Sequence, residues 1–502
     1  MAAAAGGSGD GMHGLLADMP WFRQEGWHAP RGLNYLGLGL GFLLVEQAFE
    51  VYLNLRQRQY LARDRLPREL EEQVRAIDDG ADRDVAPAVQ DMRREHGGQT
   101  AQPESLLGQL RERFTRSQTY NLAKNTFSFF SIGYTVVTSA AILLSGLNVF
   151  MWTRSRDFCA NNMGWDPSNE LAVGSVFLVA QSTLGTLINL PISLYNTFVL
   201  EAKHGFNKTT PQTFVTDVIK TIFVENILLV PLMAGIVKLV RWGGSQFWIY
   251  VWMLVFGFSL SMLTIYPNLI APLFNTYNPL PEGKLKSEIE KLASSLEFPL
   301  TKLYEVDGSK RSSHSNAYLF GFWKDKRIVL FDTLIRNPEE PSLECTTEEI
   351  VGILGHELGH WKLSHTIKGF VVQNILYAAI FKGFGYFLND PNMYLSFGFN
   401  DSEMPVVIGL NFFSYIISPL AAAVGLMLNS LTRKLEFEAD AFAVQLGKAR
   451  ELKSGLTKIY LSNLASYDVD PLYQMFHHSH PSLLERLRFM DEEATRVDKK
   501  RL

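Results

Sequence analysis

The chain has 502 residues, of which 47% are hydrophobic, 12% aromatic and only 20% charged. These proportions favour a membrane protein over a row of soluble domains. The formal net charge is −4, with no domain-wide basic excess, so we expect no nucleic-acid partner. The only two cysteines, Cys159 and Cys345, exclude a disulfide framework and favour a reducing or membrane setting.

The first 31 residues are rich in Ala and Gly, and they lack the basic start, short apolar core and cleavage site of a signal peptide. We expect residues 1–31 to be disordered. After them come seven apolar stretches long enough to cross a bilayer, so the lipid bilayer is an expected partner. These stretches run at about Leu33 to Leu55, Phe127 to Trp152, Leu171 to Leu190, Thr221 to Val240, Phe247 to Tyr266, Ile367 to Leu388 and Pro405 to Ser430.

The spans divide the chain into five expected segments. They are residues 1–31, five spans with a charged loop at 56–126 in residues 32–267, a soluble segment at 268–366, two spans at 367–430, and a soluble helical end at 431–502. Most Lys and Arg residues outside the spans lie in 56–126, 191–220, 268–366 and 431–502, which all fall on one side. The positive-inside rule therefore predicts that the soluble segment at 268–366 and the C-terminus are cytosolic.

The soluble segment contains a predicted amphipathic helix at Lys284 to Leu296 and a strand at Lys302 to Val306. A hairpin is predicted from Tyr318 to Trp323 and from Arg327 to Phe331. An exposed edge strand in such a sheet can hold an extended peptide by backbone pairing. We place the polar segment Ser312 to Tyr318 beside the cleft, although a polar turn entering a strand is the alternative.

The next stretch is His356-Glu357-Leu358-Gly359-His360, which follows an apolar run and reads as a helix. On a helix, His356 and His360 project from one face, where two imidazoles can hold a zinc ion with one open position for water. Glu357 can reach that water and act as general base, as in the metalloprotease motif H-E-x-x-H. The motif also occurs by chance, so a third ligand is required.

The best candidate for that ligand is Glu436, in a predicted helix after the last span. Asp440 shares its face at i, i+4, so one carboxylate can bind the metal while the other accepts the spare N–H of a ligand histidine. A solvated acidic helix face is the alternative. His365 competes for the third position, but it lies about 140° around a continuous helix from His360. We therefore interpret His365 as an ordinary surface histidine, and Glu438 as pointing elsewhere.

The C-terminal segment holds His477, His478 and His480, which could be plain surface residues. The terminal residues Lys499-Lys500-Arg501-Leu502 match the dilysine pattern of cytosolic tails retained in the endoplasmic reticulum.

Several strings, taken in order with the spans and HELGH, resemble the type I CAAX prenyl endoproteases over roughly residues 120 to 490. They are NTFVLEAKHGFN, YPNLIAPLFN, GSKRSSHSNAYLFGF, KRIVLFDTLI, GHELGHWKLSHT and EFEADAFAVQLG. The resemblance implies a mainly α, seven-helix membrane barrel around a water-filled chamber, with a small α+β zinc-protease domain on the cytosolic side. It also implies that the enzyme removes the last three residues from prenylated CAAX proteins in the endoplasmic reticulum membrane, with the inner nuclear envelope as a further location.

The same resemblance implies roles for individual residues. His356, His360 and Glu436 would hold one Zn²⁺ per chain, and Glu357 would be the general base. Asn316 would hold the substrate backbone, His480 would be a second catalytic residue that supports the developing oxyanion, and Arg486 would brace the ligand carboxylate.

Three other classes of protein remain as alternatives. A membrane quality-control zinc protease without prenyl specificity would use the same ligands, but usually in a shorter chain with about four spans. An intramembrane-cleaving zinc protease would bury its motif within a span, whereas charged residues flank the motif here. A transporter would carry the motif only by accident.

Overall fold

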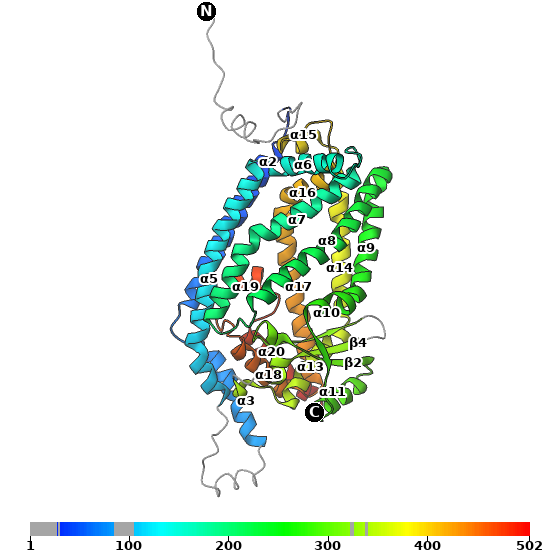
Figure 1. The fold of residues 1–502 in the computed structure, drawn as a ribbon. Coiled ribbons are helices and arrows are strands. Elements are labelled where there is room, and N and C mark those ends of the chain that lie inside the picture. Colours follow the sequence, from blue (N-terminus) through cyan, green and yellow to red (C-terminus); the bar gives the residue numbers. More distant parts are fainter. Residues whose placement is uncertain (1–27, 29–30, 85–104, 322–325, 337–339, 502) are drawn as a thin grey trace, which may run out of the picture.

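The computed structural model describes residues 28, 31–84, 105–321, 326–336 and 340–501. The disorder predicted for residues 1–31 therefore falls almost entirely outside the described residues. Figure 1 shows an elongated molecule. Long helices form its upper part, and a small sheet with shorter helices lies at its lower end.

The long-helix part has its own apolar core, built from residues such as Leu36, Phe177, Phe384 and Phe412. Its helices are α2 (Tyr35–Leu61), α5 (Leu106–Leu144), α6 (Leu147–Asn161), α7 (Glu170–Tyr195), α8 (Pro211–Trp242), α9 (Phe247–Ile265), α14 (His365–Phe387), α15 (Pro391–Ser396), α16 (Val406–Ile416) and α17 (Ser418–Gln445). Two π-helical segments, η1 (Asn196–Glu201) and η3 (Tyr266–Ile270), continue α7 and α9.

Within the described residues, six helices are long and apolar enough to cross a membrane, or seven if the bent pair of α16 and α17 is one span. The bounds predicted for the second span are wrong. Its helix α5 already begins at Leu106, because polar residues continue the helix well beyond the apolar stretch, and it ends at Leu144, before the left-handed Gly146 (φ 68°). The last span is also not straight: its two halves meet at an angle of 67°.

The second part has a separate core, which includes Ile289, Ile328, Leu354 and Leu452. Its elements are α3 (Arg68–Asp84), α10 (Ala271–Phe274), β1 (Tyr277–Pro279), α11 (Lys284–Ser295), β2 (Leu300–Val306), β3 (Ala317–Phe320), β4 (Lys326–Phe331), α12 (Asp332–Ile335), α13 (Thr347–Lys362), α18 (Ala449–Ser462), α19 (Pro471–His477) and α20 (Leu483–Arg501). The predicted amphipathic helix, strand and hairpin are confirmed as α11, β2 and the antiparallel pair β3 and β4.

The sheet has the order β1-β2-β4-β3, with β2 and β4 parallel. Strand β3 is therefore an edge strand, and it packs against α13. Strand β3 pairs with β4 in an antiparallel register that sets Tyr318 opposite Val329. The open edge of the sheet thus faces the helix that carries the two motif histidines.

Helix α13 is held at its start by a capping box. The hydroxyl of Thr346 accepts a hydrogen bond from the amide of Glu349, and the Glu349 carboxylate accepts one from the amide of Thr346 at 2.7 Å. The same buried carboxylate pairs with Lys458 on α18 at 2.7 Å and accepts a hydrogen bond from Ser454. The cap therefore fixes both the first turn of α13 and its position against α18.

Candidate metal centre

Two histidines of α13 face each other across one turn of the helix. The Nε2 atoms of His356 and His360 are 3.1 Å apart. His356 is buried and His360 is partly exposed, so the pair lies at the edge of the core. Because neutral Nε2 atoms with lone pairs directed at one another repel, this arrangement requires a proton or a metal ion between them.

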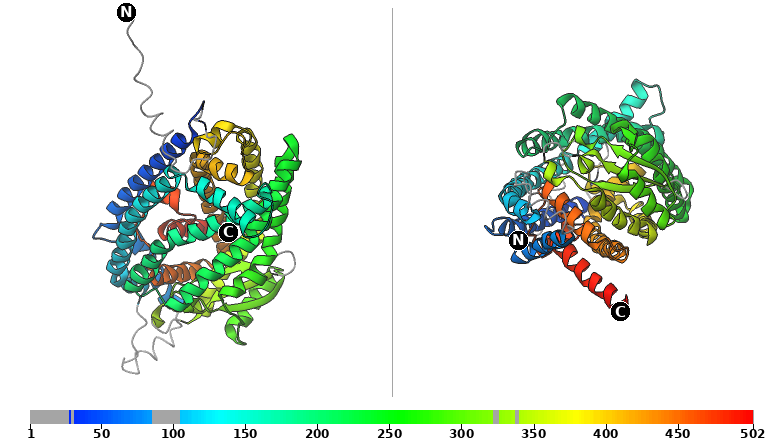
Figure 2. Two further views of the ribbon diagram at one scale, coloured as in Figure 1. Left: turned by 45° about the horizontal axis from the view of Figure 1, so that its top comes forward. Right: turned by 90° about the horizontal axis from the view of Figure 1, so that it is seen from below.

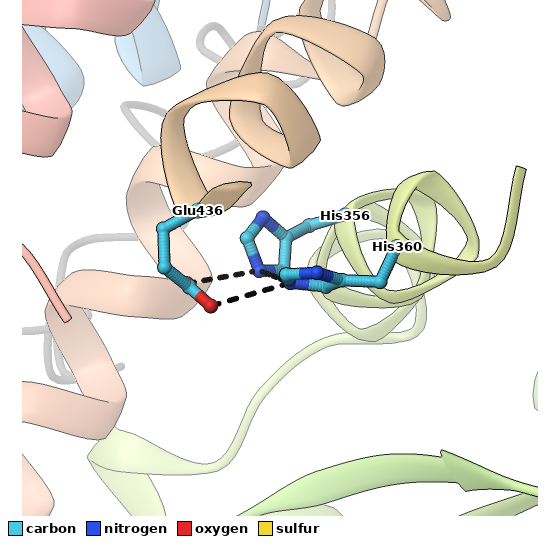
Figure 3. Close-up of side chains that lie close together, drawn as sticks. All are labelled: His356, His360 and Glu436. Atoms are coloured by element: carbon cyan, nitrogen blue, oxygen red, sulfur yellow. Dashed lines mark hydrogen bonds and ion pairs between the residues drawn. The ribbon is translucent and has the colours of Figure 1, made fainter. Parts of the chain in front are cut away.

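Glu436 reaches the same point from α17 (Figure 3). Its carboxylate oxygens lie 3.4 Å from His356 Nε2 and 3.3 Å from His360 Nε2. The three residues each offer a ligand atom, and these atoms lie within 4.8 Å of one another. Two helices that are far apart in the sequence thus bring three metal-binding groups together.

The spacing of the donors fits a zinc ion. Ligand atoms at 2.0–2.2 Å from a tetrahedral zinc ion are about 3.3–3.6 Å apart, close to the distances from Glu436 to the two histidines. The buried Oε2 of Glu436 accepts no hydrogen bond from the described residues, although a buried carboxylate oxygen normally has a partner. With Glu357 and Asp440 also nearby, the described carboxylates around this point outnumber Arg486, the cation that pairs with Asp440. The residues present therefore fit a divalent cation.

The far side of the His356 ring is fixed by a buried ion pair. Its Nδ1 lies 2.8 Å from Asp440 Oδ1, and Arg486 donates two hydrogen bonds to that carboxylate, at 2.9 and 2.6 Å. Burial and Arg486 oppose a positive charge on His356, but the carboxylates of Asp440 and Glu436 outweigh them and raise the pKa of His356 to about 9. The surrounding carboxylates thus favour a positive charge at the His356 imidazole.

Arg486 contacts the predicted ligand carboxylate only weakly. Its Nη1 is 3.9 Å from Glu436 Oε2, whereas its short hydrogen bonds go to Asp440. The geometry makes Arg486 chiefly the partner of Asp440.

Glu357 follows His356 on α13, and no described residue donates a hydrogen bond to its carboxylate. Burial raises the pKa of the Glu357 carboxyl, and the two neighbouring histidines oppose this effect. A carboxylate with a raised pKa and no fixed donor is a stronger base than one in an ion pair, and it is free to accept a proton.

The prediction that His365 is an ordinary surface histidine is wrong. His365 is 5% exposed, and its Nδ1 lies 2.9 Å from Nδ1 of His360. On its other side, Nε2 is 3.2 Å from the carboxylate of Glu438, which also pairs with Lys368. The prediction assumed one continuous helix, but α13 ends at Lys362 and the left-handed Ser364 (φ 57°) turns the chain back before α14 begins.

The two remaining predicted residues lie at the periphery. His480 Nε2 is 3.5 Å from Glu436 Oε1, and its side chain is 59% exposed. Asn316 is exposed and directly precedes β3; its side-chain oxygen accepts a hydrogen bond from the amide of Ala317. The structure thus places His480 beside the three grouped residues and Asn316 at the start of the edge strand.

Comparisons with known proteins match nearly the residues, roughly 120 to 490, over which the sequence resembles the CAAX prenyl endoproteases. A family model described as "CAAX prenyl protease N-terminal, five membrane helices" matches residues 93–276, and one described as "Peptidase family M48" matches residues 279–494. A CAAX prenyl protease 1 homolog of Arabidopsis thaliana is 42% identical over 461 residues, which cover 91% of this chain and 98% of that protein.

A CAAX prenyl protease 1 homolog of Homo sapiens is 43% identical over 415 residues, or 76% of this chain and 87% of that one. The crystal structure of Ste24p from S. mikatae has a TM-score of 0.78 and 30% sequence identity to this chain, and the match covers 92% of this chain and 100% of that one.

Proposed function

The chain belongs to the CAAX prenyl protease 1 family of the M48 metallopeptidases, and from that premise we propose that it removes the C-terminal tripeptide of prenylated CAAX proteins. The chain is a metalloendopeptidase, and its fold is a membrane chamber with a small protease domain, as expected from the sequence. The observation that carries the proposal is the meeting of His356, His360 and Glu436 beside Glu357.

In the proposed site, His356 Nε2, His360 Nε2 and the Glu436 carboxylate would hold one Zn²⁺. When bound there, the ion would lower the pKa of water at the site to about 7 and would polarise a carbonyl. Glu357 accepts the proton of the attacking water and passes it to the leaving amine. His480 donates a hydrogen bond to the oxygen that becomes negative, since its ring lies at the rim of the site beside Glu436.

The edge strand β3 supports a role in holding the substrate. Its outer edge can pair with an extended peptide, and Asn316, at its start, adds a side-chain amide to that pairing. Pairing of this kind holds a peptide backbone without reading its side chains. The specificity for prenylated substrates must then come from the prenyl group.

A membrane chamber suits such a substrate. Each buried CH₂ of a prenyl chain contributes about 0.8 kcal/mol, so the substrate enters the bilayer before it meets an enzyme. Hydrolysis, however, needs water and a polar site. A protease domain at the end of a membrane chamber provides both conditions.

The protein is a multi-pass membrane protein of its family, and we place it in the endoplasmic reticulum, with the inner nuclear envelope as a further location. The positive-inside bias puts the metal centre and the C-terminus on the cytosolic side. The structure is compatible with this orientation, because α15 and the start of α2 lie at the end opposite the sheet (Figures 1 and 2).

The test compares a farnesylated CAAX peptide with its unprenylated twin, using wild type and Glu357→Gln. We expect wild type to release the tripeptide from the farnesylated peptide at least about tenfold faster than from the unprenylated peptide. The Glu357→Gln variant should retain zinc and lose activity, by several orders of magnitude if general-base catalysis is lost. Equal turnover of both peptides would favour the quality-control protease, and full activity of Glu357→Gln would exclude this residue as the base.

A further inference from the structure

We propose that His365 is a positioning residue that holds His360 in the orientation needed to bind the metal; this rests on the metal site of the proposed function. No residue of the motif itself orients His360. The hydrogen bond from its Nδ1 to His365 Nδ1, at 2.9 Å, is the contact that does so among the described residues. His365 comes from the first turn of a membrane-spanning helix, α14.

Only one arrangement of protons satisfies the whole chain of contacts. If His360 uses Nε2 for the metal, its Nδ1 carries the hydrogen and donates it to Nδ1 of His365. His365 must then be neutral, with its own hydrogen on Nε2, and this hydrogen is donated to Glu438 at 3.2 Å. Each donor therefore has one acceptor, and the tautomer of His360 is fixed with Nε2 free to bind.

The backbone supports this arrangement. Ser364 adopts φ 57° and ψ 34°, a conformation that costs a non-glycine residue roughly 1–2 kcal/mol. This turn brings His365 back beneath His360, and His365 is buried there. Glu438 lies on α17, the helix that also carries Glu436. The contacts thus join α13, α14 and α17 around one imidazole.

The two motif histidines are held in different ways. The Nδ1 of His356 is held by a buried charged pair, Asp440 and Arg486. The Nδ1 of His360, whose side chain is more exposed, instead contacts the imidazole of His365 among the described residues. Without His365, the His360 ring can rotate about its side-chain bonds. Mutation of a residue that orients a metal ligand typically lowers metal affinity by about 10–100-fold.

Three variants of the full-length protein test the proposal: His365→Leu, His365→Asn and, as a control, Lys368→Ala. Leucine removes the acceptor and keeps the volume, whereas the Oδ1 of asparagine lies where Nδ1 of histidine does and restores an acceptor. Lys368 is one turn away and reaches Glu438 at 3.5 Å, but it does not contact His360. The measurements are zinc per chain, the rate of zinc release to excess chelator, and the visible spectrum after replacement by Co²⁺.

We expect His365→Leu to release zinc 10–100-fold faster than wild type and to change the Co²⁺ spectrum. His365→Asn and Lys368→Ala should stay within about threefold of wild type, and all three should melt like wild type in excess zinc. Unchanged release from His365→Leu would overturn the proposal, as would release from His365→Asn as fast as from His365→Leu. If wild type itself holds no zinc, the proposed function fails instead.

Discussion

A Cβ atom placed on Gly359 would lie 3.2 Å from both Cα and the carbonyl oxygen of Ala439, so α13 and α17 are in backbone contact there. Gly359 lies between the motif histidines, and Ala439 lies between Glu436 and Asp440. This contact sets the distance between the helices and therefore the distance from Glu436 to the two imidazoles.

Gly359→Ala should weaken metal retention because its methyl group pushes α13 away from α17. We expect a loss of about 1–3 kcal/mol in stability, as for other overpacked sites, and faster zinc release. Gly355→Ala is the matched control, because its Cβ would have no neighbour closer than 3.7 Å. There the better helix propensity of alanine should leave the melting temperature equal or slightly higher. Thermal unfolding and metal analysis of both variants test this, and equal zinc release would contradict it.

Glu436→Ala should reduce zinc below one ion per chain, because it removes the only proposed ligand outside α13. The neighbouring Glu438→Ala should lose much less zinc than Glu436→Ala, since Glu438 contacts His365 and Lys368 and affects the motif nitrogens only through His365. Elemental analysis after dialysis against a weak chelator distinguishes the two. Full occupancy in Glu436→Ala would remove this residue from the site.

Glu349→Ala should destabilise the protein by about 3–5 kcal/mol, because it removes the capping box of α13 and takes the carboxylate away from Lys458, whose side chain is only 13% exposed and then keeps the Glu344 carbonyl as an acceptor. Glu348→Ala, at the next position, removes an exposed ion pair with Lys284 and should cost less than about 1 kcal/mol. Thermal melting of the two variants in the same detergent measures the difference, and similar melting temperatures would refute this account of the cap.

Cys345 should react slowly with alkylating reagents until the protein unfolds. Burial raises the pKa of its thiol to about 12, so the reactive thiolate is scarce at pH 8. The folded protein keeps this proton while the unfolded chain loses it above about pH 8.5, so the thiol destabilises the fold as the pH rises from there toward 12. Iodoacetamide labelling of a Cys159→Ala background, folded and denatured, tests the prediction; equal rates would contradict it.

The orientation can be tested at the turn around Asp401, which is exposed. A glycosylation acceptor inserted there should be modified, and one at the C-terminus should not, because we place the first in the lumen and the second in the cytosol. Since Asn400-Asp401-Ser402 itself matches the acceptor pattern, the experiment uses an Asn400→Gln background. The reverse pattern would overturn the proposed topology.

Local signals in the sequence were sufficient for much of the fold. The apolar stretches indicated the spans, the alternation of residues predicted the β3–β4 hairpin, and the spacing of His356 and His360 placed both on one helix face. These features depend on neighbours within a few residues, which is why a pattern can reveal them. The start of α5 escaped this method, because a helix continues through polar residues that hydropathy assigns to a loop.

The sequence by itself indicated the family, the two motif histidines, the general-base candidate and Glu436 as the candidate for the third metal ligand. Only the tertiary structure decided what surrounds them: Arg486 against Asp440, and His365 against His360. The physical reason is that these contacts depend on how three helices pack and on one left-handed residue, Ser364. Helical periodicity applies only within one helix, and α13 ends at Lys362. The spacing of residues therefore could not predict that His365 lies beside His360.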